Sequence, residues 1–194
     1  TQMVDGRRIT DQAMLDVVTM IYGGLVNKNL VASLQAKGCN AIGLTGADGG
    51  IIRSVKRPVK TVDYGFVGDI EQVNATQIES ILKSGLYPVI APLTYSAEGI
   101  LLNTNADTMA SAVAVAMASF YKVNLVYCFE KKGVLSDPDD DDSVISALNH
   151  DLYTTYKSTG AINKGMIPKL DNAFEALNTG VSKVTICHAD ELMQ

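Results

Sequence analysis

The sequence has few cysteines, and they are far apart. Cys39, Cys128 and Cys187 form no CxxC pair, so their spacing favours neither a zinc site nor a disulfide framework. Each lies in or beside an apolar run that is typical of a strand. Such separated cysteines are usual for reduced thiols in the core of an intracellular protein, so we predict a cytoplasmic location.

Long hydrophobic runs, basic stripes and histidine clusters are also missing. No apolar run reaches the roughly 18 residues of a membrane span, so we expect no membrane association. The net charge of −5 argues against non-specific nucleic-acid binding, which requires a basic surface. His150 and His188 lack the spacing of metal ligands, and we predict no protein-held metal site.

The composition is that of a folded domain. The 194 residues are 47% apolar and 19% charged, which is enough apolar content for one packed domain over residues 1–194. Candidate strands and helices alternate, a pattern that favours a mainly parallel sheet with helices on both faces. We predict strands at 40–44, 51–55, 59–67, 88–92, 100–102, 124–129 and 182–187. We predict helices at 11–22, 25–37, 74–84, 105–119, 143–157 and 164–178.

Polar side chains gather where one predicted strand gives way to a helix. Asn103, Asn105 and Asp107 follow an apolar run and open the small-residue helix 105–119. Strand ends and helix N-termini in α/β proteins offer free backbone N–H groups and therefore face ligands. Lys169, near the start of a later helix, is a candidate source of positive charge.

Seven segments, in this order and with similar spacing, carry a resemblance to the amino acid kinase family. Within that family they are most similar to the branch that phosphorylates N-acylated glutamate. The segments are GRRIT (6–10), LVNKNL (25–30), IGLTGADGG (42–50), VGDIEQVN (67–74), YPVIAPLTYSAEGILLNTNAD (87–107), GVL (133–135) and NKGMIPKLDNA (163–173).

The resemblance implies a three-layer α/β/α sandwich around a mainly parallel sheet. It also implies ATP-dependent phosphorylation of the side-chain carboxylate of N-acetyl-L-glutamate, or of another N-acyl-L-glutamate such as the succinyl form, in arginine biosynthesis. ATP, Mg²⁺ and a homodimer are expected from the family. The apolar face of the helix at 11–22 suits either a dimer interface or the core. Two alternatives stay open: a carbamate, aspartate or glutamate kinase of the same family, and a non-catalytic acylglutamate-binding relative.

The family's N-terminal strand, with Lys-x-Gly-Gly, and its glycine-rich phosphate loops have no counterpart in this sequence. Those parts supply a second catalytic lysine and the N–H groups that hold the phosphoryl group. Since the other motifs are intact, we expect the sequence to be an incomplete portion of an active enzyme.

The resemblance also suggests residue roles. Lys169 would contact the nucleotide phosphates and the transferring group, and Asp107 would orient catalytic lysines. The substrate carboxylate is already ionised at neutral pH, so Asp107 need not act as a base. Arg8 would hold the substrate α-carboxylate through its planar guanidinium. Asn103 would bind the acyl amino acid, and Asn105, also assigned to the substrate side, would mainly organise the turn.

The nucleotide is expected at two segments: Glu130, Lys131, Lys132, Gly133, Val134 and Leu135, and then Ala161, Ile162 and Asn163. Lys131 and Lys132 depart from the common family pattern, and their sequence leaves two readings open: contact with the nucleotide or exposure to solvent. We expect the acidic stretch 137–142 to be a solvated loop, because kinases hold Mg²⁺ largely through nucleotide phosphates and water.

Overall fold

A computed structural model describes residues 3–4, 7–137, 139–160, 162 and 166–192 of the protein. The chain divides into two compact units, residues 1–117 and residues 118–194. Each unit is described by itself, and a single domain over residues 1–194 stays a prediction.

The centre of the first unit consists of two parallel strand pairs, which follow one another along the sheet. β3 (Ala41–Leu44) pairs in parallel with β6 (Tyr87–Ile90), and β4 (Ile52–Lys56) pairs in parallel with β7 (Leu93–Tyr95). The ladder continues across the bends, because Ala91 N–H donates to the Leu44 carbonyl at 2.8 Å and Gly46 N–H donates to the Leu93 carbonyl at 2.6 Å. This confirms the predicted parallel pairing in the middle of the unit.

Antiparallel strands flank this pair. β5 (Gly68–Val73) pairs with β4, and β8 (Leu101–Asn103) pairs with β7. The strand predicted at 59–67 was wrong, because the strand that pairs with β4 is β5 at 68–73. Residues of that stretch bond elsewhere, since Thr10 N–H donates to the Tyr64 carbonyl and Phe66 N–H to the Thr10 carbonyl. The short β1 (Met3–Val4) and β2 (Arg7–Arg8) pair with each other in antiparallel register.

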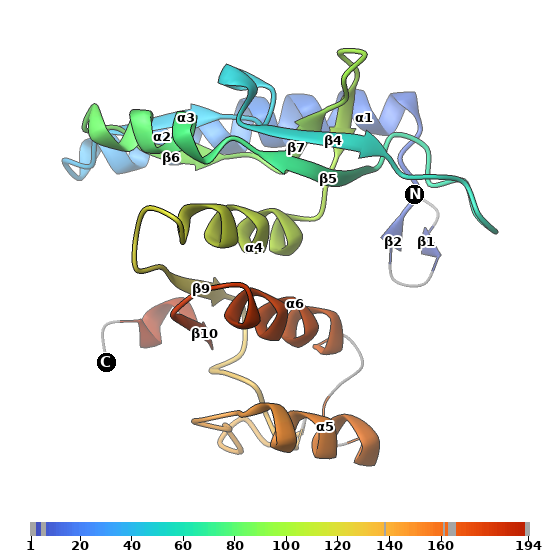
Figure 1. Ribbon diagram of the computed structural model, residues 1–194, viewed down its shortest axis with the longest axis vertical. Coiled ribbons are helices and arrows are strands. Elements are labelled where there is room, and N and C mark those ends of the chain that lie inside the picture. Colours follow the sequence, from blue (N-terminus) through green and yellow to red (C-terminus); the bar gives the residue numbers. More distant parts are fainter. Residues whose placement is uncertain (1–2, 5–6, 138, 161, 163–165, 193–194) are drawn as a thin grey trace. The chain divides into compact units, whose positions relative to one another are not determined.

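Helices lie on both faces of this sheet, as Figure 1 shows for the first unit. α1 (Gln12–Val18), a π-helical segment (Thr19–Val26) and α2 (Asn27–Ala36) run on one side, and α4 (Ala106–Met117) lies on the other. α3 (Ala75–Lys83) packs against β6 and α4. A core of Leu15, Val18 and Leu93 joins the α1 side to the sheet.

The first helix is longer than predicted. We expected Gly23 and Gly24 to end it, but the chain stays helical through them in the π segment. A helical glycine costs about 1 kcal/mol relative to alanine, which weakens a helix without stopping one that packs on a sheet. A short helical turn (Asp48–Gly50) follows β3, with Gly49 and Gly50 at positive φ.

The continuous helix over residues 12–36 is long and apolar enough to cross a membrane by length and composition. No long apolar run marks this helix in the sequence, because polar residues interrupt its apolar stretches. Inside this helix, Asn27 is buried and its Nδ2 donates to the Val89 carbonyl of β6 at 2.8 Å. Lys28 Nζ donates to the Gly43 carbonyl of β3 at 3.0 Å. These bonds fasten the helix to the sheet, as expected of a covering helix.

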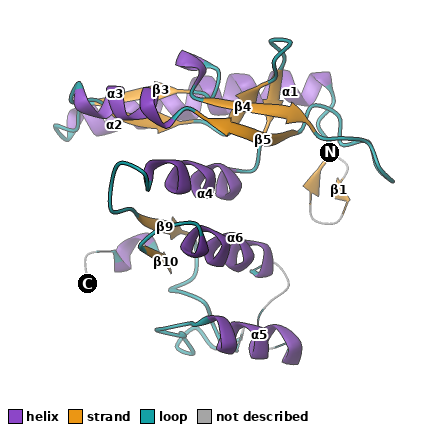
Figure 2. Ribbon diagram, in the orientation of Figure 1, coloured by secondary structure: helices purple, strands orange, loops and turns teal. Residues whose placement is uncertain are grey.

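The second unit contains the parallel pair β9 (Asn124–Cys128) and β10 (Lys183–Cys187) and the helices α5 (His150–Thr159) and α6 (Ile167–Asn178), coloured by type in Figure 2. A short helical turn (Ala189–Glu191) follows β10. The core of the second unit consists of Val134, Tyr153, Ile162 and Leu170. The predicted helix at 143–157 begins only at residue 150, where the Asn149 side chain accepts a hydrogen bond of 2.8 Å from the N–H of Leu152.

Candidate functional site

The end of β8 carries Asn103, a predicted substrate ligand. Its backbone N–H donates to the Phe66 carbonyl at 2.9 Å, and its Nδ2 donates to the Thr10 hydroxyl at 3.1 Å. The Thr10 side chain is fully buried, whereas Asn103 is half-buried. The carboxamide is therefore held in a defined orientation at the sheet edge.

Arg8 lies in β2, two residues before Thr10, and opposite Met3 in the antiparallel pair. Its side chain falls outside the described part of the chain, so its hold on a substrate carboxylate stays a prediction. The described backbone does restrict where Arg8 lies. Thr10 is fixed by its bonds with the segment at 64–66 and with Asn103, which keeps the Arg8 backbone within two residues of a point fixed to β8.

Asn105 caps α4. Its Oδ1 accepts from the Thr108 N–H at 2.9 Å and from the Thr108 hydroxyl at 3.1 Å, while its carbonyl accepts from the Met109 N–H at 3.0 Å. The expected role in organising the turn is confirmed, and its contact with substrate stays a prediction. Asp107 lies in the first turn of α4, where the positive end of the helix dipole favours a carboxylate.

Lys169 lies in the first turn of α6, next to Pro168. Its Nζ is 4.8 Å from the centroid of the Tyr127 ring on β9, a distance typical of a cation–π contact. Met166, which precedes the helix, provides no side-chain cap to it. The backbone N–H groups of this helix end and the ammonium group of the half-buried Lys169 thus carry positive charge of the kind that binds phosphate.

Part of the predicted nucleotide segment contributes to the core of its own unit. Val134 and Ile162 are 7% and 2% exposed and lie in the same apolar cluster. Gly133 is buried too, and a Cβ there would lie 2.9 Å from the Val144 side chain. The side chains of Val134 and Ile162 are committed to packing, which leaves their backbone for any contact with a nucleotide.

The remaining residues of the two nucleotide segments differ in exposure. Glu130 is exposed, and Leu135 is half-buried and forms a β-bridge with Val144. Ala161 and Asn163 lie outside the described residues. The proposed contacts of all four with a nucleotide stay predictions.

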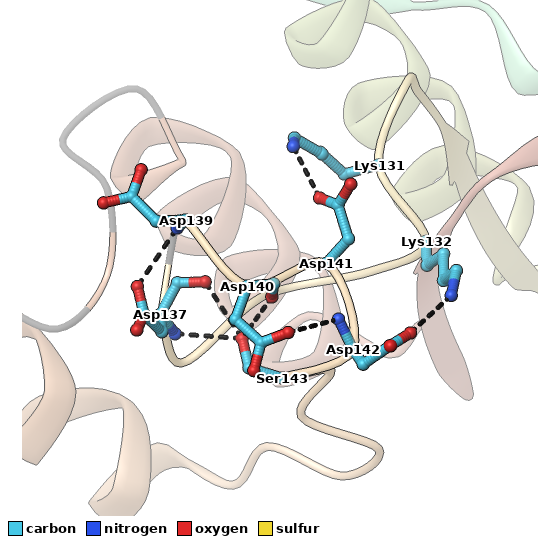
Figure 3. Close-up of polar contacts among 8 residues, drawn as sticks. All are labelled: Lys131, Lys132, Asp137, Asp139, Asp140, Asp141, Asp142 and Ser143. Carbon is cyan, nitrogen blue, oxygen red and sulfur yellow. Dashed lines mark hydrogen bonds and ion pairs between the residues drawn. The ribbon is translucent and has the colours of Figure 1, made fainter.

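Lys131 and Lys132 form ion pairs, an arrangement that the sequence analysis did not consider. Figure 3 shows Lys131 Nζ on the Asp141 carboxylate and Lys132 Nζ on the Asp142 carboxylate, at 2.6 Å and 2.7 Å. The Asp141 hydrogen bond raises the pKa of Lys131, and the Asp142 hydrogen bond raises the pKa of Lys132. The Lys131 hydrogen bond in turn lowers the pKa of Asp141. Each ammonium group is therefore paired with a carboxylate of the acidic loop.

The acidic loop itself is organised around Ser143, also visible in Figure 3. The Ser143 hydroxyl donates to the carbonyls of Asp137 and Asp140 at 2.9 Å and 2.7 Å, and it accepts from the Asp137 N–H at 3.0 Å. The Asp140 carboxylate accepts from the Asp142 N–H at 2.9 Å. These bonds hold the loop so that two of its carboxylates face the two lysines.

No group of three or more histidine, cysteine or acidic side chains among the described residues could hold a metal ion. His150 packs edge-on against Phe174, and His188 accepts from the Asp190 N–H at 3.2 Å. Both histidines thus have structural contacts.

One polar cluster was missed from the sequence. The Tyr153 hydroxyl donates to Asp171 Oδ1 at 2.7 Å, and Lys157 Nζ donates to the same carboxylate at 2.9 Å. These contacts join α5 to α6, the helix that carries Lys169. The clue was Asp171, two residues after Lys169 in NKGMIPKLDNA. Its partners, Tyr153 and Lys157, lie in a different helix, and the sequence does not reveal how the two helices pack.

Comparison with known proteins identifies the family. The description "Amino acid kinase family" matches residues 2–188. A Cytophaga hutchinsonii protein named acetylglutamate kinase is 61% identical over 194 residues, which are 100% of this chain and 74% of the relative. A Bacteroides fragilis protein with the same name is 58% identical over 99% of this chain and 74% of the relative. A Methanopyrus kandleri relative of that name is 39% identical over 100% of this chain and 79% of its own.

Solved structures agree with the fold. The Streptococcus mutans protein smu.665 superposes with a TM-score of 0.82 at 31% identity, covering 96% of this chain and 72% of its own. An N-acetylglutamate synthase from Neisseria gonorrhoeae, solved with coenzyme A and N-acetyl-glutamate, has a TM-score of 0.76 at 22% identity, over 96% of this chain and 41% of its own. The predicted α/β fold class is confirmed.

Proposed function

Because the chain belongs to the amino acid kinase family, we propose that it catalyses phosphoryl transfer from ATP to the side-chain carboxylate of N-acetyl-L-glutamate. The observation that carries this proposal is the 61% identity, over the whole of this chain, to a relative named acetylglutamate kinase. No observation favours a carbamate, aspartate or glutamate kinase, or a non-catalytic relative.

Phosphoryl transfer to a carboxylate does not require the protein to form a covalent intermediate. Both reactants are anions, and the accepting carboxylate is ionised at neutral pH, so catalysis needs alignment and stabilisation of charge on the moving group. Lys169 is suited to that work, because it is a half-buried cation in the first turn of a helix. Asp107 is proposed to orient cationic groups from the first turn of α4.

The substrate is proposed to bind near the end of β8, where Asn103 contacts Thr10, two residues after β2. Arg8 would pair with the α-carboxylate, and Asn103 would hydrogen-bond the acyl amino acid. The bond between Asn103 and Thr10 supports this assignment, because it fixes these two parts of the chain to one another. Asn105 would act mainly by keeping the turn into α4 in place.

The nucleotide is proposed to lie along Glu130–Leu135 and 161–163. ATP is the phosphoryl donor, and Mg²⁺ would enter with it, bound to its phosphates and water. When bound, Mg²⁺ neutralises phosphate charge, a task that needs no dedicated cluster of protein carboxylates.

We further propose that the protein acts in arginine biosynthesis in the cytoplasm and forms a homodimer. The dimer proposal rests on the helix over residues 12–36, whose outer face exposes large apolar side chains. Val17, Met20, Leu25 and Val26 are 46%, 63%, 57% and 51% exposed. Covering this face with a second copy would remove that surface from water.

A coupled assay of ADP release tests the proposed reaction. We expect turnover with N-acetyl-L-glutamate, and the succinyl analogue measured in parallel identifies the preferred acyl group. Hydroxylamine, which traps acyl phosphates, should yield the hydroxamate of the acylglutamate. Absence of ADP release with both substrates, measured on the complete protein, would contradict the proposal. Sedimentation of the wild type and of Met20→Asp would test the dimer, which the added charge should dissociate.

A further inference from the structure

Two cysteines that are far apart in the sequence are direct neighbours in the sheet. Cys128 ends β9 and Cys187 ends β10, and the two residues are partners in the parallel register of these strands. Register partners in a sheet project their side chains from the same face. The third cysteine, Cys39, lies in the other unit, just before β3.

The spacing of the two strands suits a covalent link between these side chains. Neighbouring strands lie about 4.7–4.9 Å apart. Disulfides join residues whose Cα atoms are about 4.4–6.8 Å apart. The spacing expected for these register partners therefore falls within the range of disulfides, although the sequence spacing gave no sign of a pair.

The two thiols differ in accessibility. Cys128 is exposed, whereas Cys187 is buried. Burial raises the pKa of Cys187, and the nearby Cys128 thiol raises it further through its charge and its hydrogen bond. The exposed thiol is thus the one that a reagent in solution can reach first, and the buried thiol is protected from direct attack but lies beside it.

We propose that Cys128 and Cys187 form a reversible redox modification site, which closes to an intramolecular disulfide by exchange with a small-molecule disulfide such as oxidised glutathione. The Cys128 thiolate, having released its proton to solvent, attacks one sulfur of the reagent, forming a mixed disulfide and releasing one reduced thiol. Cys187 then loses its proton and attacks the Cys128 sulfur, forming the protein disulfide and releasing the second thiol. The two protein thiols lose two electrons, and the reagent gains them.

The link would act on the start of the segment that follows β9. The Phe129 N–H donates to the Cys187 carbonyl at 3.1 Å, so the contact between the two segments continues to the residue after Cys128. A disulfide there would fasten the entry into Glu130–Leu135 to the end of β10. The site rests on strand register alone and does not depend on the proposed kinase reaction.

Intact mass and peptide mapping test the inference on the native protein incubated with oxidised glutathione. We expect the protein to lose the mass of two hydrogen atoms, with the linked peptides containing Cys128 and Cys187, and to regain it with dithiothreitol. Cys39→Ser is the matched control and should behave like the wild type. Cys187→Ala should stop at a glutathione adduct on Cys128, and Cys128→Ser should give neither product at Cys187.

A second reagent tests the proximity of the thiols without oxidation. A monosubstituted arsenic(III) oxide condenses with two neighbouring thiols and releases water, so one arsenic should bind per chain in the wild type and in Cys39→Ser. The Cys128→Ser variant changes an exposed position and should lose that binding while remaining folded. A wild-type protein that accumulates only the mixed disulfide, or binds no arsenic under native conditions, would overturn the proposal.

Discussion

The carboxamide of Asn103 donates a hydrogen bond of 3.1 Å to the hydroxyl of Thr10, whose side chain is fully buried. The two residues lie 93 positions apart in the chain. Thr10 also exchanges backbone hydrogen bonds with the segment at 64–66, and Asn103 bonds to the same segment. Through its backbone and its hydroxyl, Thr10 thus joins the N-terminal segment to the loop before β5 and to the end of β8.

Thr10→Val removes this hydroxyl while keeping the volume of the side chain. We expect a loss of stability of about 1–2 kcal/mol, because a half-buried amide loses its acceptor. We also expect the KM for acetylglutamate to rise while the KM for ATP stays unchanged. Urea unfolding and steady-state kinetics measure the two effects. Thr179→Val, at an exposed helix end, is the control. An unaltered KM for acetylglutamate in Thr10→Val would show that Thr10 does not support the substrate site.

Gly68 at the start of β5 lies against two buried threonines that bond to each other. A Cβ at this position would lie 2.7 Å from Thr104 Oγ1 and 2.9 Å from Thr94 Oγ1, which are themselves 2.8 Å apart. Gly68→Ala should therefore destabilise the protein by about 1–3 kcal/mol, the usual cost of overpacking. Gly24→Ala is the matched control, since a Cβ there meets nothing within 4 Å. Equal urea midpoints for the two variants would show that the sheet yields at Gly68.

Local signals predicted most of the elements. The helix expected at 105–119 is α4 over 106–117, because Asn105 provides a cap that can be recognised in the sequence. The strands β9 and β10 agree with their predicted bounds to within one residue, since both are short apolar runs.

Predictions from the sequence were wrong or incomplete where tertiary contacts compete with the local pattern. Val144 and Ile145 have helical spacing with Leu148, yet Val144 bridges to Leu135 and the Ile145 N–H donates to the Val134 carbonyl. Those bonds keep the segment irregular until residue 150. The ion pairs of Lys131 and Lys132 were unpredictable for a similar reason, because they depend on how Ser143 closes the acidic loop.

Asp141→Asn combined with Asp142→Asn would release the two lysine ammonium groups. If Lys131 and Lys132 face the nucleotide, the freed charges should lower the KM for ATP by about two- to fivefold at low salt. The effect should shrink as salt rises, because exposed charges are screened. The KM for acetylglutamate should not change. Asp16→Asn paired with Asp11→Asn alters the net charge equally in the other unit, and an ATP effect of the same size there would exclude a local cause.

The contact between α5 and α6 should make stability depend on pH. Burial raises the pKa of Asp171, but hydrogen bonds from Lys157 and Tyr153 outweigh it, so the net pKa is lowered. Burial and the Asp171 hydrogen bond raise the pKa of Tyr153, and the Asp171 and Tyr153 hydrogen bonds raise that of Lys157. Stability from the lowered carboxyl is present above about pH 4 and is lost as pH falls through its folded pKa. Stability from the raised groups is present below about pH 10 and is lost as pH rises.

Asp171→Asn should therefore flatten both limbs of the stability profile, whereas Tyr153→Phe should flatten only the alkaline limb clearly. Urea midpoints measured by circular dichroism between acidic and alkaline pH give the two profiles. Asp151→Asn, an exposed acid in the first turn of α5, is the control. If the stability of Asp171→Asn fell with acid in parallel with that of the wild type, the Asp171 contact would not be the cause of the acidic pH dependence.

Lys169→Ala tests the electrostatic basis of the proposed transfer. Removing one preorganised cation from a transition state typically lowers turnover by about 10²–10³-fold, and we expect that loss in kcat with a smaller change in the KM for acetylglutamate. Lys169→Arg keeps the charge but alters its geometry and should recover part of the rate. Lys183→Ala removes an exposed lysine from β10 and should leave turnover unchanged. Because Lys169 also contacts the Tyr127 ring, urea midpoints must accompany the kinetics. A folded Lys169→Ala enzyme with wild-type kcat would refute the assignment and move the search for the catalytic cation to other residues.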